Sequence, residues 1–481
     1  MENWKKVIIV LLVIVGALLV YIPHYGYDYP LHVDEWNSID AVRIAQNEGL
    51  FNLIDSPVES GFHLFLIIID LLFPLVLVYK FLPFMNFVLI SGVLFYFLNK
   101  RYNYYVGLFS IVFFASLKSN VNVLGNWFFV PITFAVVFIY SYLFDLEDSL
   151  NDKGKSLLLC VLFLFLIAFI HPSSFLVLAV VGVIFFVTKH HELERKCKRF
   201  LPLILLLIPI LLIVYYFTGF SDFSYLISRL VWKPLVLQIN FVPITFYGLL
   251  ASFFAFYGFY FSYKRKELLG FRIYFLISLI SLIGFWFIGR TLFSAYQRYL
   301  YHFMLGAVVF SAIGFYEFLN LVYRKFDSYR KETRVFVLIL MVALVVLSLF
   351  YGYGKTYEGT EVYHAIDKND YDALIFLRDY DTNYIPHRFY LDSAKLISPR
   401  GPGTASYAIS NKASIASLTY YYKQEGSDFA ERFFKDDCDG KEEILAEYDN
   451  LMYVYSYEEI DCLFLREIYR NEKVIIYWEV D

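Results

Sequence analysis

Long apolar blocks are the feature that most limits how this chain of 481 residues can fold. Apolar residues make up 59% of the sequence and charged residues 18%. The apolar residues come in blocks close to the ~20 residues that cross a bilayer as a helix. A water-soluble fold has too little interior to bury so much apolar surface. The sequence therefore predicts a polytopic α-helical membrane protein.

The first apolar block, residues 7–22, follows Lys5 and Lys6 and has the length of a secretory signal. The residues after it lack the small side chains that a signal-peptide cleavage site needs. We therefore expect a membrane span that is retained in the mature protein.

The number of spans depends on the apolar segment 61–79, which carries His63, Asp70 and Pro74. If this segment is embedded without crossing, 20 of the 27 Lys and Arg residues before residue 353 fall at cytoplasmic ends. Counting it as a crossing would place the basic loop 189–199 outside, against the positive-inside tendency. We expect a cytoplasmic N-terminus in the cell membrane, an extracytoplasmic C-terminus and about eleven spans: 6–22, 81–99, 104–118, 127–144, 157–170, 173–188, 201–218, 241–263, 270–288, 301–322 and 335–352.

The composition changes near residue 353. The last 129 residues hold 14 Lys and Arg against 25 Asp and Glu. This charge balance argues against nucleic acid or anionic lipid as a partner of the tail, because both require basic patches. We predict a transmembrane domain over 1–352, a small soluble α/β domain over 353–481, a helix at 371–380, strands at 388–391, 451–456 and 474–478, and a turn-rich loop at 398–404.

Cysteine is scarce, with four residues in the chain. Cys438 and Cys462 share the predicted outer domain, where they form either a disulfide or two unpaired thiols. The chain has no Cys and His at metal-ligand spacing, no phosphate-binding glycine loop before a helix, and no internal repeat of 20–50 residues.

Two adjacent acids, Asp34 and Glu35, lie in the first outer loop, residues 23–80. A carboxylate held at the membrane surface can act as a general base toward an attacking hydroxyl. The alternative is helix capping, because acids at a helix start satisfy free amide groups and the helix dipole.

Four features of the chain resemble the GT-C membrane glycosyltransferases, and in particular the protein mannosyltransferase and aminoarabinose transferase relatives. The acidic pair lies in His32–Trp36 and runs into the amphipathic stretch 38–49, like that family's Asp-Glu motif and juxtamembrane helix. The embedded segment 61–79 resembles the second juxtamembrane helix. The other two features are the arginine motif Gln297–Leu300 at a span entrance and the outer tail that contains 451–456 and 472–478.

This resemblance implies a GT-C-like fold with juxtamembrane helices in the first outer loop. It also implies transfer of a hexosyl or pentosyl group, with inversion, from a polyprenyl-phosphate donor to a protein, lipid or glycan acceptor outside the cytoplasm. The family's conserved aspartate matches Asp34, which would be the general base, and Glu35 would orient the acceptor or a divalent cation such as Mg²⁺ or Mn²⁺. The chain has no strong match to the sequon-recognition signature of an oligosaccharyltransferase, which argues against that subfamily.

Cations at the outer span ends are the candidates for binding the donor phosphate. Arg298 is the first candidate, because it lies outside in the predicted orientation, where cations are few. Snorkelling of a basic side chain to the lipid headgroups is the alternative. The further candidates for substrate binding are Arg290, Lys118, His171, His63 and Asp70, and the aromatic loop 217–241 is a candidate lid over the donor.

Two other function classes fit a chain of this type. A transporter or lipid flippase should show paired broken spans or an internal repeat around a polar midplane site, and the sequence shows neither. A catalytically silent scaffold would use the outer domain to bind a partner, and Asp34 would then only cap a helix.

Overall fold

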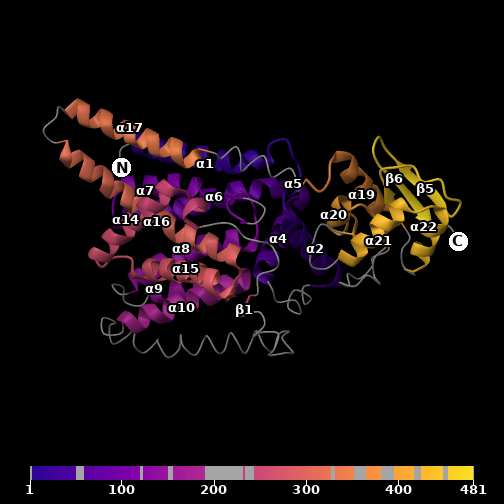
Figure 1. Ribbon diagram of the computed structural model, residues 1–481, viewed down its shortest axis with the longest axis horizontal. Helices are drawn as coiled ribbons and strands as arrows, with labels where there is room; N and C mark the ends of the chain where they lie inside the picture. Colours follow the sequence, from indigo (N-terminus) through magenta and orange to yellow (C-terminus); the bar gives the residue numbers. More distant parts are fainter. Residues whose placement is uncertain are drawn as a thin grey trace. The chain divides into compact units, whose positions relative to one another are not determined.

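The chain forms two compact units in the computed structural model (Figure 1). The first unit comprises Met1–Pro23, Pro57–Phe62 and Phe81–Gly359, and the second comprises His24–Ser56, His63–Lys80 and Thr360–Asp481. The structure describes residues 3–49, 59–119, 123–149, 155–189, 231–232, 243–326, 331–351, 364–380, 395–416, 424–447 and 453–479. The division after Gly359 lies close to the predicted domain boundary at 352/353. Most of the first outer loop, however, groups with the C-terminal residues rather than with the spans.

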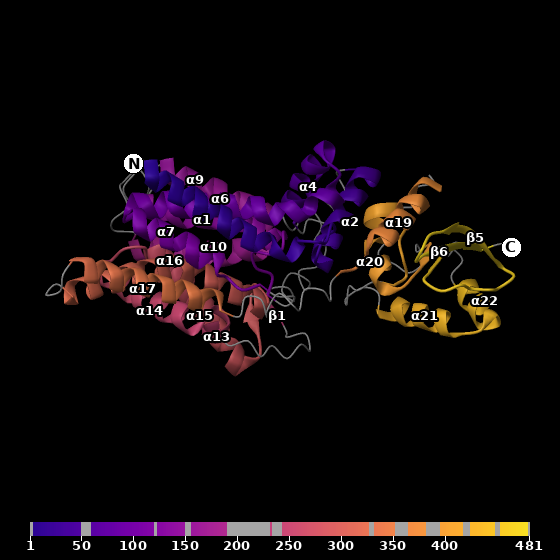
Figure 2. The same cartoon turned by 90° about the horizontal axis from the view of Figure 1, so that it is seen from above.

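The first unit is a bundle of helices that run side by side (Figures 1 and 2). Its helices are α1 (Asn3–Tyr21), α6 (Leu82–Arg101), α7 (Tyr104–Ala115), α8 (Pro131–Asp148), α9 (Lys155–Ile170), α10 (Pro172–Lys189), α13 (Pro243–Tyr247), α14 (Leu249–Lys264), α15 (Leu269–Ile288), α16 (Tyr296–Lys325) and α17 (Lys331–Phe350). The short strands β1 (Val231–Trp232) and β2 (Thr291–Leu292) pair antiparallel.

Helix α16 is the central helix of this bundle. Every residue from Tyr299 to Phe315 is buried, as expected for a helix that is covered on all sides. It packs against α7, α14 and α15. A Cβ at Gly314 would collide with the Phe254 carbonyl, and a Cβ at Gly258 would collide with the Phe310 carbonyl. Glycine at these two positions therefore allows the backbones of α14 and α16 to touch, as small residues do between membrane helices.

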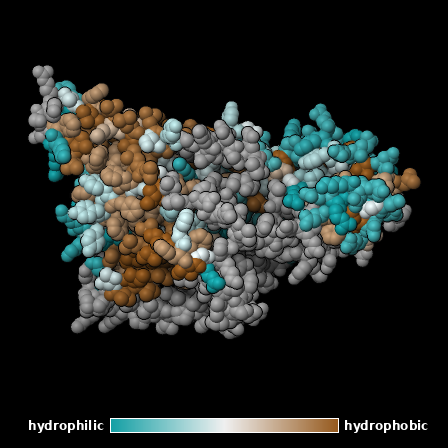
Figure 3. All heavy atoms as spheres, in the orientation of Figure 1, coloured by the Kyte–Doolittle hydropathy of each residue, from teal (hydrophilic) through white to brown (hydrophobic). Residues whose placement is uncertain are grey.

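Six helical segments in the described part of the chain are long and apolar enough to cross a membrane: Asn3–His24, Leu75–Arg101, Pro172–Lys189, Leu269–Ile288, Tyr296–Lys325 and Lys331–Phe350. Hydrophobic residues cover much of the visible described face of the first unit (Figure 3). Two predicted spans, 104–118 and 157–170, correspond to the shorter helices α7 and α9. The predicted span 201–218 lies outside the described residues. The structure confirms a polytopic helical protein but not the count of eleven spans.

The segment predicted to be embedded without crossing is broken into short pieces. Helix α4 (Ser60–Leu72) has 13 residues and ends just before Pro74, and α5 (Leu75–Val78) follows. A helix of that length extends roughly 20 Å, which is less than the ~30 Å hydrocarbon core. The break at Pro74 has a simple cause, because proline has no amide hydrogen and disfavours helix in the residue before it.

The C-terminal part of the second unit is a small α/β domain. Its sheet has the strand order β3-β4-β6-β5, in which β3 (Leu396–Ile397) is parallel to β4 (Tyr453–Ser456), whereas β5 (Leu465–Arg470) and β6 (Ile475–Glu479) pair antiparallel. The helices are α19 (Lys368–Tyr380), α20 (Arg400–Ser410), α21 (Gln424–Lys435) and α22 (Cys438–Ala446). The structure therefore confirms the predicted helix at 371–380 and the strands near 451–456 and 474–478. The predicted strand 388–391 lies outside the described residues.

Two local predictions for this domain have different outcomes. The turn-rich loop predicted at 398–404 is wrong, because Arg400 already begins α20 after Pro399. Proline disfavours helix in the residue before it but is compatible with a helix that starts just after it. Cys438 and Cys462 form a disulfide with a Cα–Cα distance of 5.6 Å, which links the start of α22 to the segment before β5.

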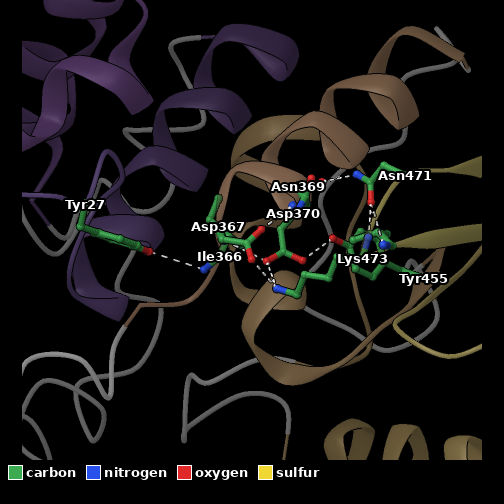
Figure 4. Close-up of polar contacts among 9 residues, drawn as sticks. Tyr27, Ile366, Asp367, Asn369, Asp370, Tyr455, Asn471 and Lys473 are labelled. Carbon is green, nitrogen blue, oxygen red and sulfur yellow. Dashed lines mark hydrogen bonds and ion pairs between the residues drawn. The ribbon is translucent and has the colours of Figure 1, made fainter.

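A buried carboxylate, that of Asp370, fastens α19 to the β5–β6 hairpin (Figure 4). It accepts hydrogen bonds from Lys473 Nζ at 2.8 Å and from the Tyr455 hydroxyl at 2.7 Å. Lys473 also pairs with Asp367, at 2.8 Å. Asn471 receives two amide hydrogen bonds in the hairpin and donates to the Asn369 carbonyl, at 2.9 Å. One lysine thus neutralises two carboxylates at this helix–hairpin contact.

The pKa values of these groups follow from that geometry. Burial opposes the charge of Asp367, but hydrogen bonds from Lys473 and from the Asp370 amide outweigh it and lower the pKa of Asp367. Burial likewise opposes the charge of Lys473, and its two carboxylate partners outweigh it and raise the pKa of Lys473. The stability from Asp367 is therefore present above the pKa of an unfolded aspartate and is lost as pH falls through the depressed value. The stability from Lys473 is lost as pH rises through its raised value.

Replacing Lys473 by methionine is expected to destabilise the second unit by about 2 to 3 kcal/mol at pH 7. This is below the ~3–5 kcal/mol typical of breaking a fully buried pair, because water reaches part of the lysine. The check is urea-dependent proteolysis of the full-length protein. Lys435→Met, which removes an exposed pair with Glu431, is the matched control and should change stability by less than ~0.5 kcal/mol. The loss at Lys473 should shrink as pH falls through the lowered pKa of Asp367, because a protonated Asp367 needs no counter-ion. A loss that stays constant down to pH 2 would contradict this account.

Candidate functional site

The two adjacent acids of the first loop have different environments at the start of α2 (Val33–Glu48). Glu35 is fully buried, and its Oε2 accepts hydrogen bonds from the amides of Leu31 at 2.8 Å and His32 at 3.1 Å. The imidazole of His32 accepts from the Asp34 amide, which completes a capping box. The structure therefore gives Glu35 the capping role that the sequence left open for both acids.

Asp34 carries the accessible carboxylate of the pair. Its side chain is 44% exposed, and its Oδ2 lies 3.8 Å from His32 Nδ1. Because the cap is supplied by His32 and Glu35, the Asp34 carboxylate is not needed for it. Of these two acids, therefore, Asp34 and not Glu35 can present its carboxylate to a substrate.

Helix α2 is held in the second unit by Arg43. Its guanidinium forms an ion pair with Asp70 of α4 at 2.6 Å and donates from Nε to the Ala408 carbonyl of α20 at 3.2 Å. Asp70 also accepts from Gln46 at 2.7 Å and from the Leu75 amide at 3.2 Å. These contacts account for the buried carboxylate of Asp70 without a substrate, so its predicted binding role stays a prediction.

The segment before α2 also contacts the C-terminal residues within the second unit. The ring of Tyr27 stacks on His364 with a centroid distance of 3.9 Å. Its hydroxyl accepts from the Ile366 amide at 3.5 Å (Figure 4). Together with the contact between Arg43 and Ala408, this explains why most of the first loop groups with the C-terminal α/β domain. His63, a predicted binding residue, lies on α4 and is half-buried.

A second group of polar residues lies in the first unit, around Arg298 in the first turn of α16. Arg298 Nη1 lies 3.1 Å from His171 Nε2 and approaches the Ser173 hydroxyl at 3.5 Å. His171 joins α9 to α10 and is buried. Arg298 is half-buried, and none of the carboxylates in the described part of the chain forms an ion pair with it. A half-buried guanidinium without a carboxylate is suited to binding an anion.

The structure brings together two of the predicted donor-site residues, Arg298 and His171. Arg290 is exposed after α15, and Lys118 is half-buried after α7. Neither forms an ion pair with another described residue. The sequence analysis missed Ser174, Tyr274 and His302, which continue the hydrogen bonds inward from His171. His302 could have been selected from the sequence, because an ionisable residue within an apolar span is a candidate for a functional site.

The candidate lid, residues 217–241, is described only at Val231 and Trp232. These two residues form β1, which pairs with Thr291 and Leu292 in β2. Strand β2 precedes α16 by only three residues. The lid segment is thus joined to the stretch of chain that leads into Arg298, and the rest of the segment lies outside the described residues.

Asp34 and Glu35 are the residues that the sequence suggests as ligands if a divalent cation is bound. The Oε2 atom of Glu35 accepts hydrogen bonds from the Leu31 and His32 amides, whereas the Asp34 side chain is 44% exposed. Within the described ranges, no group of three or more His, Cys, Asp or Glu side chains could hold a metal ion. A cation bound by Asp34 and Glu35 therefore stays a prediction.

Comparison with solved structures identifies the fold. ArnT from Cupriavidus metallidurans, bound to undecaprenyl phosphate, matches with a TM-score of 0.58 and 9% identity, over 98% of both chains. The oligosaccharyltransferase of Archaeoglobus fulgidus in the apo form matches with a TM-score of 0.57 and 14% identity, over 95% of this chain and 70% of that chain. The chain has a GT-C-like fold.

The archaeal oligosaccharyltransferase AglB from Archaeoglobus fulgidus, in complex with an inhibitory peptide and a dolichol-phosphate, matches with a TM-score of 0.51 and 15% identity, over 95% of this chain and 70% of that chain. No protein-family model matches the sequence, and no curated protein matches it. The GT-C-like fold confirms the resemblance predicted from the sequence, together with a multi-pass membrane architecture. At these identities the likeness shows the fold alone.

Proposed function

We propose that this protein is a membrane glycosyltransferase that moves a sugar from a polyprenyl-phosphate donor to an acceptor hydroxyl outside the cytoplasm. The observation that carries the proposal is Arg298. Its guanidinium lies at the entrance of the central helix of a GT-C-like fold and has no carboxylate partner among the described residues. Structures with this fold hold undecaprenyl phosphate in ArnT and a dolichol-phosphate in AglB.

The proposed reaction is a single displacement. The acceptor oxygen forms a bond to the anomeric carbon while the bond from that carbon to the phosphate oxygen breaks. Asp34 takes the acceptor proton, and the lipid monophosphate leaves as an anion that Arg298 stabilises. A phosphate needs no proton to leave, so one carboxylate suffices, in contrast to the acid–base pair of glycosidases. A single displacement inverts the anomeric centre.

The roles of the other predicted residues follow from their surroundings. Glu35 caps α2 and thereby holds Asp34 in place, and His171 lies against Arg298. We propose Lys118 and Arg290 as secondary cations near the donor headgroup. The distribution of basic residues supports an extracytoplasmic active site, and the acceptor is a protein, lipid or glycan hydroxyl.

A panel of radiolabelled lipid-phosphate sugars tests this function. We expect purified protein in lipid nanodiscs to release undecaprenyl or dolichyl phosphate from at least one hexosyl or pentosyl donor, and to do so only when acceptor is present. The matched control is the corresponding free sugar phosphate, which lacks the lipid and should react poorly. Movement of intact donor between leaflets without any transfer would instead identify a flippase. Binding without transfer or movement would identify a scaffold.

A further inference from the structure

His171 caps the start of helix α10. Its Nδ1 accepts a hydrogen bond from the Ser174 amide at 3.2 Å, and its carbonyl accepts from the Phe175 amide at 3.2 Å. The imidazole is buried, with 1% of its surface exposed. A side chain that accepts from the third amide of a helix is a usual N-cap. The reaction as proposed above gives this histidine no role of its own.

The cap determines where the proton of the imidazole lies. An amide is always a donor, so Nδ1 of His171 carries no proton, and the single proton of the neutral ring lies on Nε2. The neighbouring contacts agree with this tautomer. The Ser174 hydroxyl donates to the same Nδ1 at 2.7 Å and accepts from His302 Nε2 at 3.3 Å, and the Tyr274 hydroxyl donates to His302 Nδ1 at 2.7 Å.

The Nε2–H group of His171 therefore faces another donor. Arg298 Nη1 lies 3.1 Å from Nε2, and arginine has only donors. The Ser173 hydroxyl lies 3.5 Å from Nη1, which is too far for a strong hydrogen bond. Two N–H groups that face each other at this distance repel, whereas an oxygen placed beside both of them can accept from each. The contact between His171 and Arg298 is thus suited to an acceptor that neither side chain supplies.

Two helices begin at this contact. Helix α10 starts at Pro172 and α16 starts at Tyr296, and the N-cap residue of α16, Ala295, has no side chain that could cap it. The N-terminal end of a helix carries free amides and partial positive charge. Both helix ends therefore add to the charge of Arg298 rather than offset it. Such surroundings favour a bound anion.

We propose that His171 is a second ligand of the donor phosphate, and that its Nε2–H donates to a phosphate oxygen that also accepts from Arg298. A phosphate monoester has three terminal oxygens that are strong acceptors, so one of them can serve both donors. The cap of α10 holds the imidazole in the tautomer that this contact requires. This inference rests on the proposed role of Arg298 as the donor-phosphate ligand.

His171→Asn separates the proposed role from capping, with undecaprenyl phosphate as the probe and the full-length protein in detergent. Asparagine is a good N-cap and keeps an acceptor for the Ser174 amide, but it is too short to place an N–H at the Nε2 position. We expect thermal stability close to that of wild type. The affinity for the probe should fall about 10- to 100-fold, the effect of one hydrogen bond to a charged group. Binding of undecaprenol, which has no phosphate, should not change.

A second pair of variants keeps the test independent of the cap. His171→Gln and His171→Met both lose the cap, and only glutamine can bring an N–H near the Nε2 position. The glutamine variant should bind undecaprenyl phosphate about tenfold more tightly than the methionine variant. Equal affinities of this pair would overturn the proposal even if His171→Asn does not fold.

Asn103→Ala is the matched control for a change in stability. Asn103 caps α7 in the same unit, where its Oδ1 accepts from the Tyr105 amide at 3.0 Å and from the Val106 amide at 3.1 Å. Its replacement should lower the unfolding temperature and leave the affinity for undecaprenyl phosphate unchanged.

The outcomes distinguish the role of His171 from the proposed function. Wild-type affinity in His171→Asn, or an equal loss of undecaprenol binding, would show that His171 only caps α10, and Arg298 would remain the proposed ligand. If Arg298→Gln does not weaken binding of the probe, the donor-phosphate site itself is wrong, and the role of His171 fails with it.

Discussion

Asp34→Asn is expected to lower the rate of glycosyl transfer by about 10²- to 10⁴-fold, the range that general-base catalysis usually supplies. Asparagine has nearly the same size as aspartate but cannot take the acceptor proton. The fold should persist, because the α2 cap is made by His32 and Glu35 and the Asp34 side chain is 44% exposed. The measurement is the transfer rate at saturating donor and acceptor, with donor binding followed separately. Donor affinity should stay near the wild-type value, because Asp34 is assigned to the acceptor.

Asp28→Asn is the matched control for that experiment. Asp28 is an acid of the same loop and pairs with Lys80, and its side chain is 69% exposed. Its loss should leave the transfer rate within about twofold of wild type, because exposed ion pairs contribute little. Glu35→Gln should behave differently again and lower stability by about 1 kcal/mol, since it weakens the capping box. Full activity in Asp34→Asn would exclude Asp34 as the base and favour a purely structural acid.

The architecture was predictable because hydropathy and charge act over whole segments. Apolar blocks identify the long apolar helices, and the change to an acidic composition identifies the separate C-terminal α/β domain, regardless of any individual contact. The first outer loop was assigned to the transmembrane domain because it lies between spans in the sequence. Its grouping with the C-terminal residues depends on single contacts, such as Arg43 to Ala408, that join residues 365 positions apart.

The contacts within the candidate site were harder to predict from the sequence than the architecture. Asp34 and Glu35 are neighbours with the same charge, so the sequence does not distinguish them. The geometry at the start of α2 lets Glu35 accept hydrogen bonds from two amides and leaves the Asp34 carboxylate accessible. Arg298 and His171 were each predicted from their place at span ends, but their mutual contact was not. Tyr274 and Ser174 are common residue types in apolar helices, so nothing in the sequence separates them from packing residues.

Arg298→Gln is expected to reduce kcat/KM for the lipid-phosphate donor by about 10²- to 10³-fold, the usual effect of removing one group that stabilises developing charge. Arg298→Lys keeps the charge but loses the planar pair of donors, and should recover part of the activity. We expect the lysine variant to remain about tenfold below wild type, since one hydrogen bond to a charged group is lost. The measurements are steady-state kinetics with a polyprenyl-phosphate sugar and binding of undecaprenyl phosphate.

The far end of the same helix provides the control for Arg298. Arg324 is exposed near the end of α16, roughly 39 Å away along a helix with a rise of 1.5 Å per residue. If basic side chains at span ends serve only to reach lipid headgroups, Arg298→Gln and Arg324→Gln should have equally small effects. If Arg298 binds the donor phosphate, only its replacement should reduce kcat/KM, and only its replacement should weaken the binding of undecaprenyl phosphate. An unchanged kcat/KM in Arg298→Gln would remove the proposed phosphate ligand and with it the reason to place the donor beside α16.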